Sequence, residues 1–494
     1  MTQPDTVLDR RRAGLLLHPT SLPGPGSCGR LGPDAYWFVD FLRDAGFGVW
    51  QTLPLGPTHD GGSPYQSLSV HAGDPRLVSR ALLVQWGWLP GLSPEAAEAA
   101  GDDVLGAAWD GFREHADAPA RAEFDAFCEH NAHWLEDFAL FQALRDVYEG
   151  KPWTQWPRGR RDRTPKALAR VRRELADAVE RIRFVQFLFR RQWRLLRAYA
   201  NERGILLLGD LPIFASHDSA EVWAHRDYFA LDDQGRPLTV AGVPPDYFSA
   251  TGQLWGNPHY RWDVMQADGF RWWVERVAGQ RELFDLIRID HFRGFEAYWE
   301  VAADAPDATN GRWVKAPGEA LFRTLRERLG PHLPLVAEDL GLITPEVEAL
   351  RARFGFPGMK ILQFAFDGST DNPYLPHRHR ENCVVYTGTH DNNTSLGWFE
   401  ELTEERKYAV RDYLAHPSDP MPWPLVRWAF ASVARLTVVP LQDVLGLDAA
   451  HRMNRPGTTE GNWTWRFGWD WFPQDVAQRM HHLIRIYGRE PASG

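Results

Sequence analysis

Four short apolar segments of the chain lead directly to side chains that can carry or transfer protons. They are ILLLGD ending in Asp210, LIRID ending in Asp290, LPLVAE ending in Glu338, and CVVYT leading to His390 and Asp391. One acidic residue at the end of a strand is ordinary, because Asp caps a following helix well. Several such positions in one chain, some beside Arg or His, favour a shared chemical site.

Two or three carboxylates around one cavity suit the cleavage or transfer of glycosidic bonds. One carboxylate attacks the anomeric carbon, a second protonates the leaving oxygen, and a third can favour an oxocarbenium-like transition state. Arg288 lies two residues before Asp290, on the same face of a strand, so it can keep Asp290 ionised. Glu338 must instead carry a proton at neutral pH, and partial burial near negative charge would raise its pKa accordingly.

The elements that must position these residues alternate between short apolar runs and longer amphipathic stretches, as βα units do. The predicted strands are 14–18, 48–53, 205–210, 286–290, 333–338, 359–364, 383–387 and 437–441. Helical patterns, such as 33–45, 344–354 and 403–414, lie between most of them. This order predicts an α/β fold, a (β/α)₈ TIM barrel, in which the carboxyl ends of the strands converge on one pocket.

Two intervals are too long for simple crossovers, so we expect a single catalytic barrel over 1–494 with insertions. A helical subdomain is predicted after the second strand, at approximately 75–165, followed by one long helix over 167–203. A loop-rich insertion is predicted at approximately 211–269, where Pro and Gly are frequent. Long loops in compact domains are usually functional, so we expect this one to cover the active-site cleft.

The composition limits the partners of the protein. With 65 acidic against 55 basic residues and a net charge of −10, the chain is a poor candidate for binding nucleic acid. No apolar run reaches the ~20 residues of a membrane span. The three cysteines form no disulfide framework, so we expect a soluble cytoplasmic protein. The 23 tryptophans are consistent either with binding sugar faces or with filling a large core.

Signals for a metal or a cofactor are weak. The segment 129–133 (EHNAH) has loosely metal-like spacing, but a polar helix face is the better interpretation because no second Cys/His group accompanies it. The HExxH and GxxxxGK[ST] motifs do not occur. We therefore expect no metal and no cofactor.

Nine segments of the chain, taken together and in this order, resemble one known family. They are GLLLHPTSLPGPGSCGRLG (14–32), LPLGPTHDGGSPYQS (53–67), GDLPIFASHDSAEVW (209–223), GVPPDYFSATGQLWGNPHY (242–260), RIDHFRGF (288–295), VAEDLG (336–341), GMKILQFAFD (358–367), YTGTHDNNT (386–394) and VLGLDAAHRMNRPGTTEGNWTWR (444–466). The chain is similar to the 4-α-glucanotransferases called amylomaltase or disproportionating enzyme, within the wider α-amylase superfamily.

The resemblance implies roles for individual residues. Asp290 matches the nucleophile, Glu338 the general acid and base, and Asp391 the stabiliser of the transition state. The implied substrate-binding residues are Tyr65, which stacks on the sugar next to the cleaved bond, Asp210, Arg288, His291 and His390 on the donor side, Gln253 and Trp255 on an acceptor loop, and Phe364 and Asn462. One departure is at 60–62 (DGG), where many relatives have an aromatic residue. It puts a peripheral glucan-binding contact in doubt and leaves the catalytic residues untouched.

The implied function is the transfer of α-1,4-glucan segments between maltodextrin or starch chains, or to glucose, by disproportionation and possible cyclisation. The implied partners are maltooligosaccharides, amylose, starch or glycogen, and glucose; the sequence leaves the oligomeric state open, with a monomer plausible. Two alternatives remain open at this point. A retaining hydrolase of the α-amylase type would use the same carboxylates, and an inactive glucan-binding protein would keep the cleft without turnover.

Overall fold

The protein is described here by a computed structural model that covers residues 8–101, 103–245 and 249–491. Eight parallel strands form one sheet in the order β10-β11-β12-β1-β2-β3-β6-β9. Their bounds are β1 (Arg12–Leu16), β2 (Val49–Gln51), β3 (Leu206–Leu211), β6 (Leu286–Ile289), β9 (Leu335–Ala337), β10 (Gly358–Ile361), β11 (Cys383–Tyr386) and β12 (Leu436–Pro440). Between β9 and β10 a hydrogen bond from Ala337 N to Pro357 O, 2.9 Å long, bridges the two ends. The predicted (β/α)₈ barrel is confirmed.

Alternate residues of each strand pack on opposite sides of the barrel wall. On β11, for example, Val384 and Tyr386 belong to the buried cluster inside the barrel. Cys383 and Val385 belong to a separate cluster under the outer helices. This two-residue period follows from the pleat of a strand and fixes which side chains reach the mouth of the barrel.

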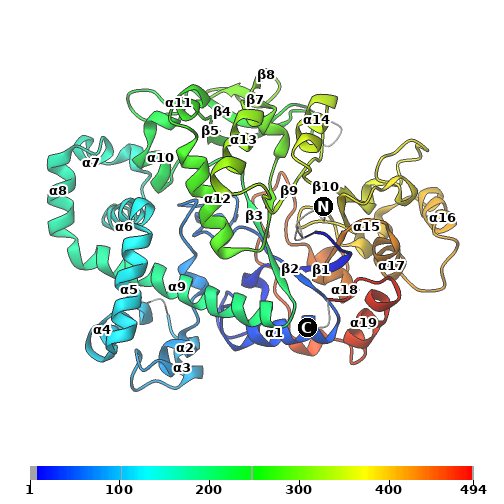
Figure 1. The fold of residues 1–494 in the computed structure, drawn as a ribbon, viewed down its shortest axis with the longest axis horizontal. Coiled ribbons are helices and arrows are strands. Elements are labelled where there is room, and N and C mark those ends of the chain that lie inside the picture. The colour runs from blue at the N-terminus through cyan, green and yellow to red at the C-terminus, as the bar shows by residue number, and fades with distance from the viewer. Residues whose placement is uncertain (1–7, 102, 246–248, 492–494) are drawn as a thin grey trace.

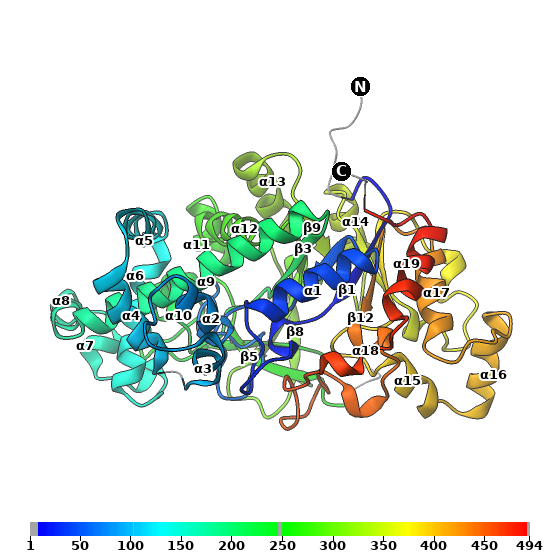
Figure 2. The ribbon, with the colours of Figure 1, turned by 90° about the horizontal axis from the view of Figure 1, so that it is seen from below.

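Helices cover the outside of the barrel (Figures 1 and 2). They are α1 (Pro33–Asp44), α12 (Arg271–Leu283), α13 (Gly318–Leu329), α14 (Pro345–Arg353), α15 (Ser395–Glu401), α16 (Glu404–Tyr413), α17 (Trp423–Ala431), α18 (Leu441–Val444) and α19 (Val476–Ile486). Within the described ranges, no helix is long and apolar enough to cross a membrane. All three cysteines are free.

Helices fill the interval between β2 and β3 and project to one side of the barrel, as the cyan ribbon of Figure 1 shows. They are α2 (Arg80–Gln85), α3 (Pro94–Ala99), α4 (Val104–His115), α5 (Ala118–His130), α6 (Ala132–Val147), α7 (Arg158–Arg161), α8 (Pro165–Glu174) and α9 (Ala176–Glu202). The single helix expected over 167–203 is wrong: Leu175, at φ −113° and ψ 23°, separates α8 from α9. The division of this region into a subdomain stays a prediction.

A second sheet lies beside the barrel, with four antiparallel strands in the order β5-β4-β7-β8. Its strands are β4 (Thr239–Val243), β5 (Gln253–Pro258), β7 (Ala297–Ala302) and β8 (Gly311–Lys315). The interval 211–269, predicted to be rich in loops, also contains β4, β5, α10 (Ala220–Ala224) and α11 (Trp262–Ala267). Residues 246–248 of the interval lie outside the described residues. The strands escaped prediction because both contain Gly, β5 also contains Pro, and β4 pairs with β7, which lies beyond β6 in the chain.

Candidate active site

The two-residue period of the strands carries ionisable side chains to the mouth of the barrel. Leu208, Leu286 and Val336 pack together inside the barrel. Asp210, Arg288 and Glu338 each follow one of these residues by two positions, so they point to the same interior side one step closer to the carboxyl end. Asp290 continues β6 in the same way. Local strand geometry alone therefore gathers these groups at one end of the barrel.

A cavity of about 640 Å³ opens at this end and is lined by most of the residues that the sequence singled out. These are Asp290, Glu338, Asp391, Tyr65, Gln253, Trp255, Arg288, His291, Phe364 and Asn462. Asp210 and His390 do not belong to its lining. The side chain of Asp210 is 0% exposed and lies behind Arg288. His390 lies behind Asp391, with its Nε2 3.2 Å from Asp391 Oδ2.

Arg288 holds two carboxylates at once at the floor of this cleft. Its Nη1 donates to both oxygens of Asp210 at 2.7 Å and lies 3.1 Å from Asp290 Oδ1. Tyr65 donates its hydroxyl to Asp210 Oδ2 at 2.7 Å. Burial raises the pKa of Asp290 to about 6, and the charge of Arg288 opposes this rise without cancelling it. Asp290 is consequently ionised at neutral pH, although its affinity for a proton is above that of an exposed Asp.

Glu338 has the opposite protonation state. Its Oε2 accepts a hydrogen bond from His291 N at 2.6 Å and its Oε1 accepts one from Leu340 N at 3.1 Å. Burial nevertheless raises the pKa of Glu338 to about 8; Arg288 opposes the rise and the charge of Asp290 adds to it. Glu338 therefore carries a proton at pH 7, while Asp290 does not, and a pair of carboxyl groups with separated pKa values is the usual sign of distinct acid and base roles.

The backbone between these two groups is strained. His291 has a φ of 49°, in the left-handed region that a residue with a β-carbon enters at a cost of about 1–3 kcal/mol. This conformation accompanies the hydrogen bond from its N–H group to Glu338. The next residue, Phe292, donates its N–H to Glu338 O at 3.0 Å. The turn after β6 thus fixes the side chain of Glu338, which directly follows β9, relative to Asp290.

Asp391 is kept ionised by its neighbours. Asn454 Nδ2 donates to Asp391 Oδ1 at 2.6 Å. Burial alone would raise the pKa of Asp391, but His390 and this hydrogen bond outweigh burial and lower the pKa to about 2. Asn454 was not singled out from the sequence, although it lies in the family segment 444–466, because nothing local indicates that it contacts a residue so distant in the chain.

Aromatic rings border the cleft on two sides. On one side, Trp255 of β5 meets the ring of His291 edge to face, with 4.8 Å between centroids, and its Nε1 donates to Gln253 Oε1 at 3.2 Å. On the other side, Tyr65 stacks on His390 with 5.3 Å between centroids, and Trp463 lies 6.0 Å from Tyr65. The cleft therefore offers ring faces on both sides of the carboxylates, as a sugar chain requires.

Asn462 lines the cleft but is engaged by its own loop. Its side chain accepts a hydrogen bond from Arg455 N at 2.9 Å and donates one to Thr458 O at 2.9 Å. The residue therefore shapes the loop over 455–462, and a direct contact with substrate would compete with these bonds.

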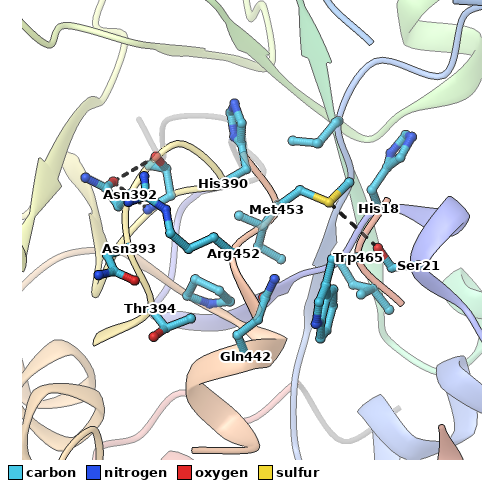
Figure 3. Close-up of a pocket in the computed structure, with 15 residues that line it drawn as sticks. His18, Ser21, His390, Asn392, Asn393, Thr394, Gln442, Arg452, Met453 and Trp465 are labelled. Atoms are coloured by element: carbon cyan, nitrogen blue, oxygen red, sulfur yellow. Dashed lines mark hydrogen bonds between the residues drawn. The ribbon is translucent and has the colours of Figure 1, made fainter. Parts of the chain in front are cut away.

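Figure 3 shows a second cavity, which His390 lines. Its volume is only about 30 Å³. In the described part of the chain, His18 Nδ1, both amide atoms of Asn393 and Trp465 Nε1 have no hydrogen-bond partner. Such a polar space has room for about one or two water molecules and is far too small for a sugar. The large cleft is accordingly the candidate substrate site. Over residues 8–101, 103–245 and 249–491, no group of three or more His, Cys, Asp or Glu side chains is arranged to hold a metal ion.

Comparison with known proteins identifies the family. A family model described as 4-alpha-glucanotransferase matches residues 17–470. The chain belongs to the 4-alpha-glucanotransferase family. It is 52% identical to a 4-alpha-glucanotransferase of Thermus thermophilus, over 92% of this chain and 94% of the relative. It is 46% identical to a 4-alpha-glucanotransferase of Synechocystis, over 98% of this chain and 99% of the relative. The chain is thus a glycosyltransferase enzyme, and the alternative of an inactive glucan-binding protein is not supported.

A solved structure agrees with this membership of the 4-alpha-glucanotransferase family. The amylomaltase of Streptococcus agalactiae, solved in complex with acarbose, superposes with a TM-score of 0.92 at 39% identity, over 97% of this chain and 100% of that chain. The amylomaltase of Corynebacterium glutamicum has a TM-score of 0.75 at 17% identity, over 98% of this chain and 76% of that chain, and shows the shared fold alone.

Proposed function

We propose that this 4-alpha-glucanotransferase works by double displacement, with Asp290 as the nucleophile and Glu338 as the acid and base. The bond that is cleaved and the bond that is formed are both α-1,4, so the configuration at the anomeric carbon is retained overall. Two successive inversions at the anomeric carbon, by way of a covalent bond to a carboxylate, produce that outcome. The observation that carries the proposal is a pair of carboxyl groups that line one cleft in different surroundings. Asp290 lies 3.1 Å from Arg288 Nη1 and has a pKa of about 6, whereas the buried Glu338 accepts hydrogen bonds from His291 N and Leu340 N and has a pKa of about 8.

In the first step, a carboxylate oxygen of Asp290 attacks the anomeric carbon of the donor sugar. The glycosidic bond breaks, and its oxygen takes the proton of Glu338, which releases the reducing-end fragment. In the second step, the deprotonated Glu338 removes the proton from the 4-hydroxyl group of an acceptor glucan or glucose, and that oxygen displaces Asp290. If the acceptor is the free end of the donor chain itself, a cyclic glucan forms. Glu338 loses its proton in the first step and regains one in the second, so the two steps together return the enzyme to its starting protonation state.

The remaining site residues have supporting roles in this proposal. Asp391, ionised and held by Asn454, accepts hydrogen bonds from donor-sugar hydroxyls and stabilises positive charge in the transition state. Tyr65 provides a ring face for that sugar. Asp210 acts from behind, because it binds Arg288 and Tyr65 and does not line the cleft. Its role is therefore to position other residues and not to contact the substrate.

The proposed substrates are maltooligosaccharides, amylose, starch or glycogen, with glucose as the smallest acceptor. Transfer requires that water compete poorly for the covalent intermediate. Trp255, packed against His291 next to the catalytic residues, is placed to bind an acceptor sugar and to exclude water. A cytoplasmic location stays a prediction.

Incubation with maltotriose alone tests the proposed function. We expect a ladder of glucans longer and shorter than maltotriose, with free glucose, because segments move between chains. The total number of reducing ends should stay constant, since transfer breaks one bond for each bond that it forms. Chromatography of the products and a reducing-end assay measure both quantities. A rising number of reducing ends with glucose and maltose as the only products would instead identify a hydrolase.

The variant Trp255→Ala provides a comparison for the same experiment. If Trp255 holds the acceptor and shields the intermediate, the number of reducing ends should rise with time in this variant while the ladder shrinks. An unchanged balance of transfer and hydrolysis would remove Trp255 from the proposal without affecting the roles of the carboxylates.

The pKa values of the two carboxyl groups predict a bell-shaped dependence of kcat/KM on pH. Asp290 acts ionised, so activity should fall as the pH drops below about 6, its pKa in the free enzyme. Glu338 acts protonated in the first step, so activity should also fall as the pH rises above about 8. Initial rates of maltotriose disproportionation between pH 4.5 and 9.5 measure both limbs, the range being about 1.5 units beyond each value. A profile that stays flat to pH 9.5 would contradict the role of Glu338.

A further inference from the structure

A large aromatic side chain stands at the edge of the cleft without a role in the proposed reaction. Trp313 of β8 lines the same 640 Å³ cavity as the catalytic residues, and 37% of its surface is exposed. On the same strand, the next residue, Val314, packs against the buried core. Because strand residues alternate between faces, Trp313 points away from that core. The ring of Trp313 is therefore not used in the core beneath the sheet, and it lines the cleft instead.

The indole ring of Trp313 is held rigidly by two neighbours. The guanidinium carbon of Arg293 lies 3.6 Å from the ring centroid, so Arg293 covers one face of the ring. Arg293 is itself fixed, since its Nη1 donates to Leu342 O at 2.6 Å. Trp299, the cross-strand partner of Trp313 on β7, meets it edge to face with 5.2 Å between centroids. A ring fixed in this way can bind a flat ligand without losing further freedom of movement.

The neighbours of Trp313 also show on which side of the catalytic residues it lies. The segment 291–293, which includes Arg293, runs along the segment 338–342. His291 and Phe292 donate their N–H groups to Glu338, and Arg293 donates to Leu342 O. Trp313 therefore belongs to the side of the general acid, and Leu342, which is 57% exposed, lines the cleft there too. The acid protonates the oxygen of the leaving fragment, so the leaving fragment and the acceptor must occupy this side. The rings of Tyr65 and His390 lie with Asp391 on the other side.

We propose that Trp313 forms an acceptor subsite beyond the first acceptor sugar, where the exposed part of its ring packs against a glucose unit of an α-1,4-glucan. This inference rests on the proposed function, because the acceptor side is defined by the role of Glu338. Trp255 lies next to the catalytic residues and serves the first acceptor sugar; Trp313 serves acceptors of two or more units. Arg293 acts as a positioning residue that holds the ring.

The test compares acceptors of different length with a donor that leaves the acceptor side empty. With a maltosyl fluoride as donor, fluoride departs in the first step and no donor sugar occupies the acceptor side. We expect Trp313→Ala to raise the ratio of the KM for maltotriose to the KM for glucose as acceptors roughly five- to tenfold, since stacking on one ring is lost. Trp313→Phe, which keeps a smaller ring, should raise this ratio less. Thermal unfolding of each variant reports whether the fold is intact.

Trp37→Ala is the matched control, because Trp37 on α1 is also an exposed tryptophan, 46% exposed, but does not line the cleft. Its KM ratio should equal that of the unmodified enzyme. The proposal is overturned if the ratio in Trp313→Ala stays within about twofold of the unmodified value, a difference below the weakest ring interactions, or if both KM values rise in parallel. Should Trp313→Ala fail to fold, an unchanged ratio in Trp313→Leu, which keeps an apolar side chain without a ring, overturns it. Failure of the proposed function would look different: the unmodified enzyme would transfer to no acceptor.

Discussion

Replacing Asp290 with Asn is expected to lower the turnover of maltotriose by about 10⁴-fold or more while the protein stays folded. The amide has the shape of the carboxylate but cannot attack the anomeric carbon, so no covalent intermediate forms. The fold should tolerate the change because the buried Arg288 keeps both oxygens of Asp210 at 2.7 Å. Initial rates, with binding of maltoheptaose measured by calorimetry, separate lost chemistry from lost affinity.

The same substitution at Asp371 provides a control for this experiment. Asp371 is 88% exposed and pairs with Arg378 at the surface, where ion pairs contribute little to stability. Asp371→Asn should therefore keep full activity. Loss of a true nucleophile leaves far less than one hundredth of the turnover. If Asp290→Asn retained turnover within about 100-fold of the unmodified enzyme, Asp290 would not be the nucleophile.

The carboxylates could be found from the sequence because barrel strands can be recognised by their apolar residues. A buried apolar run identifies a strand, and its carboxyl end in a barrel identifies the cleft. That reasoning located Asp290, Glu338 and Asp391, and all three line one cavity. It could not tell that Asp210 lies behind the cleft and not in its wall, because Asp210 and Asp290 occupy similar positions on their strands. The difference comes from Tyr65 and Arg288, which cover Asp210 from elsewhere in the chain.

Residues that act through distant contacts gave no usable signal. Asn454 binds Asp391, and Arg293 covers Trp313, but neither pair is close in sequence. The small sheet was missed for a related reason. The exposure of β8 follows no regular alternation, so the strand has none of the hydrophobic periodicity by which buried strands are recognised. Its existence depends on pairing with β7, which only the tertiary fold provides.

The high tryptophan content left two interpretations open, and both apply to different residues. Trp50, Trp153, Trp193, Trp223 and Trp273 are among the largest fully buried side chains of the protein. The tryptophans that line the cleft are Trp255, Trp313 and Trp463. Composition alone could not divide these groups, because an indole serves equally well in a core and against a sugar.

Replacing Glu338 with Gln is expected to lower the turnover of maltotriose by about 10²- to 10⁴-fold, the usual contribution of general acid–base catalysis. The loss should be much smaller in the first step when the donor is a glycosyl fluoride, because fluoride leaves without a proton. The second step still lacks its base, so the intermediate on Asp290 should accumulate. Mass spectrometry of the intact protein, which gains the mass of the bound sugar, measures this accumulation. An equal loss in the rate of the first step with both donors would rule out proton donation by Glu338.

The pH profile of Glu338→Gln connects each limb to its residue. The residual activity on maltotriose should no longer fall as the pH rises above about 8, because the carboxyl group that titrates there has been removed. The activity should still fall as the pH drops below about 6, as in the unmodified enzyme. At that pH Glu338 is protonated and uncharged in the unmodified enzyme, so exchanging it for an uncharged amide leaves the electrostatic surroundings of Asp290 nearly unchanged. A shift of the acidic limb together with loss of the alkaline one would mean that the two carboxyl groups titrate as a single coupled pair.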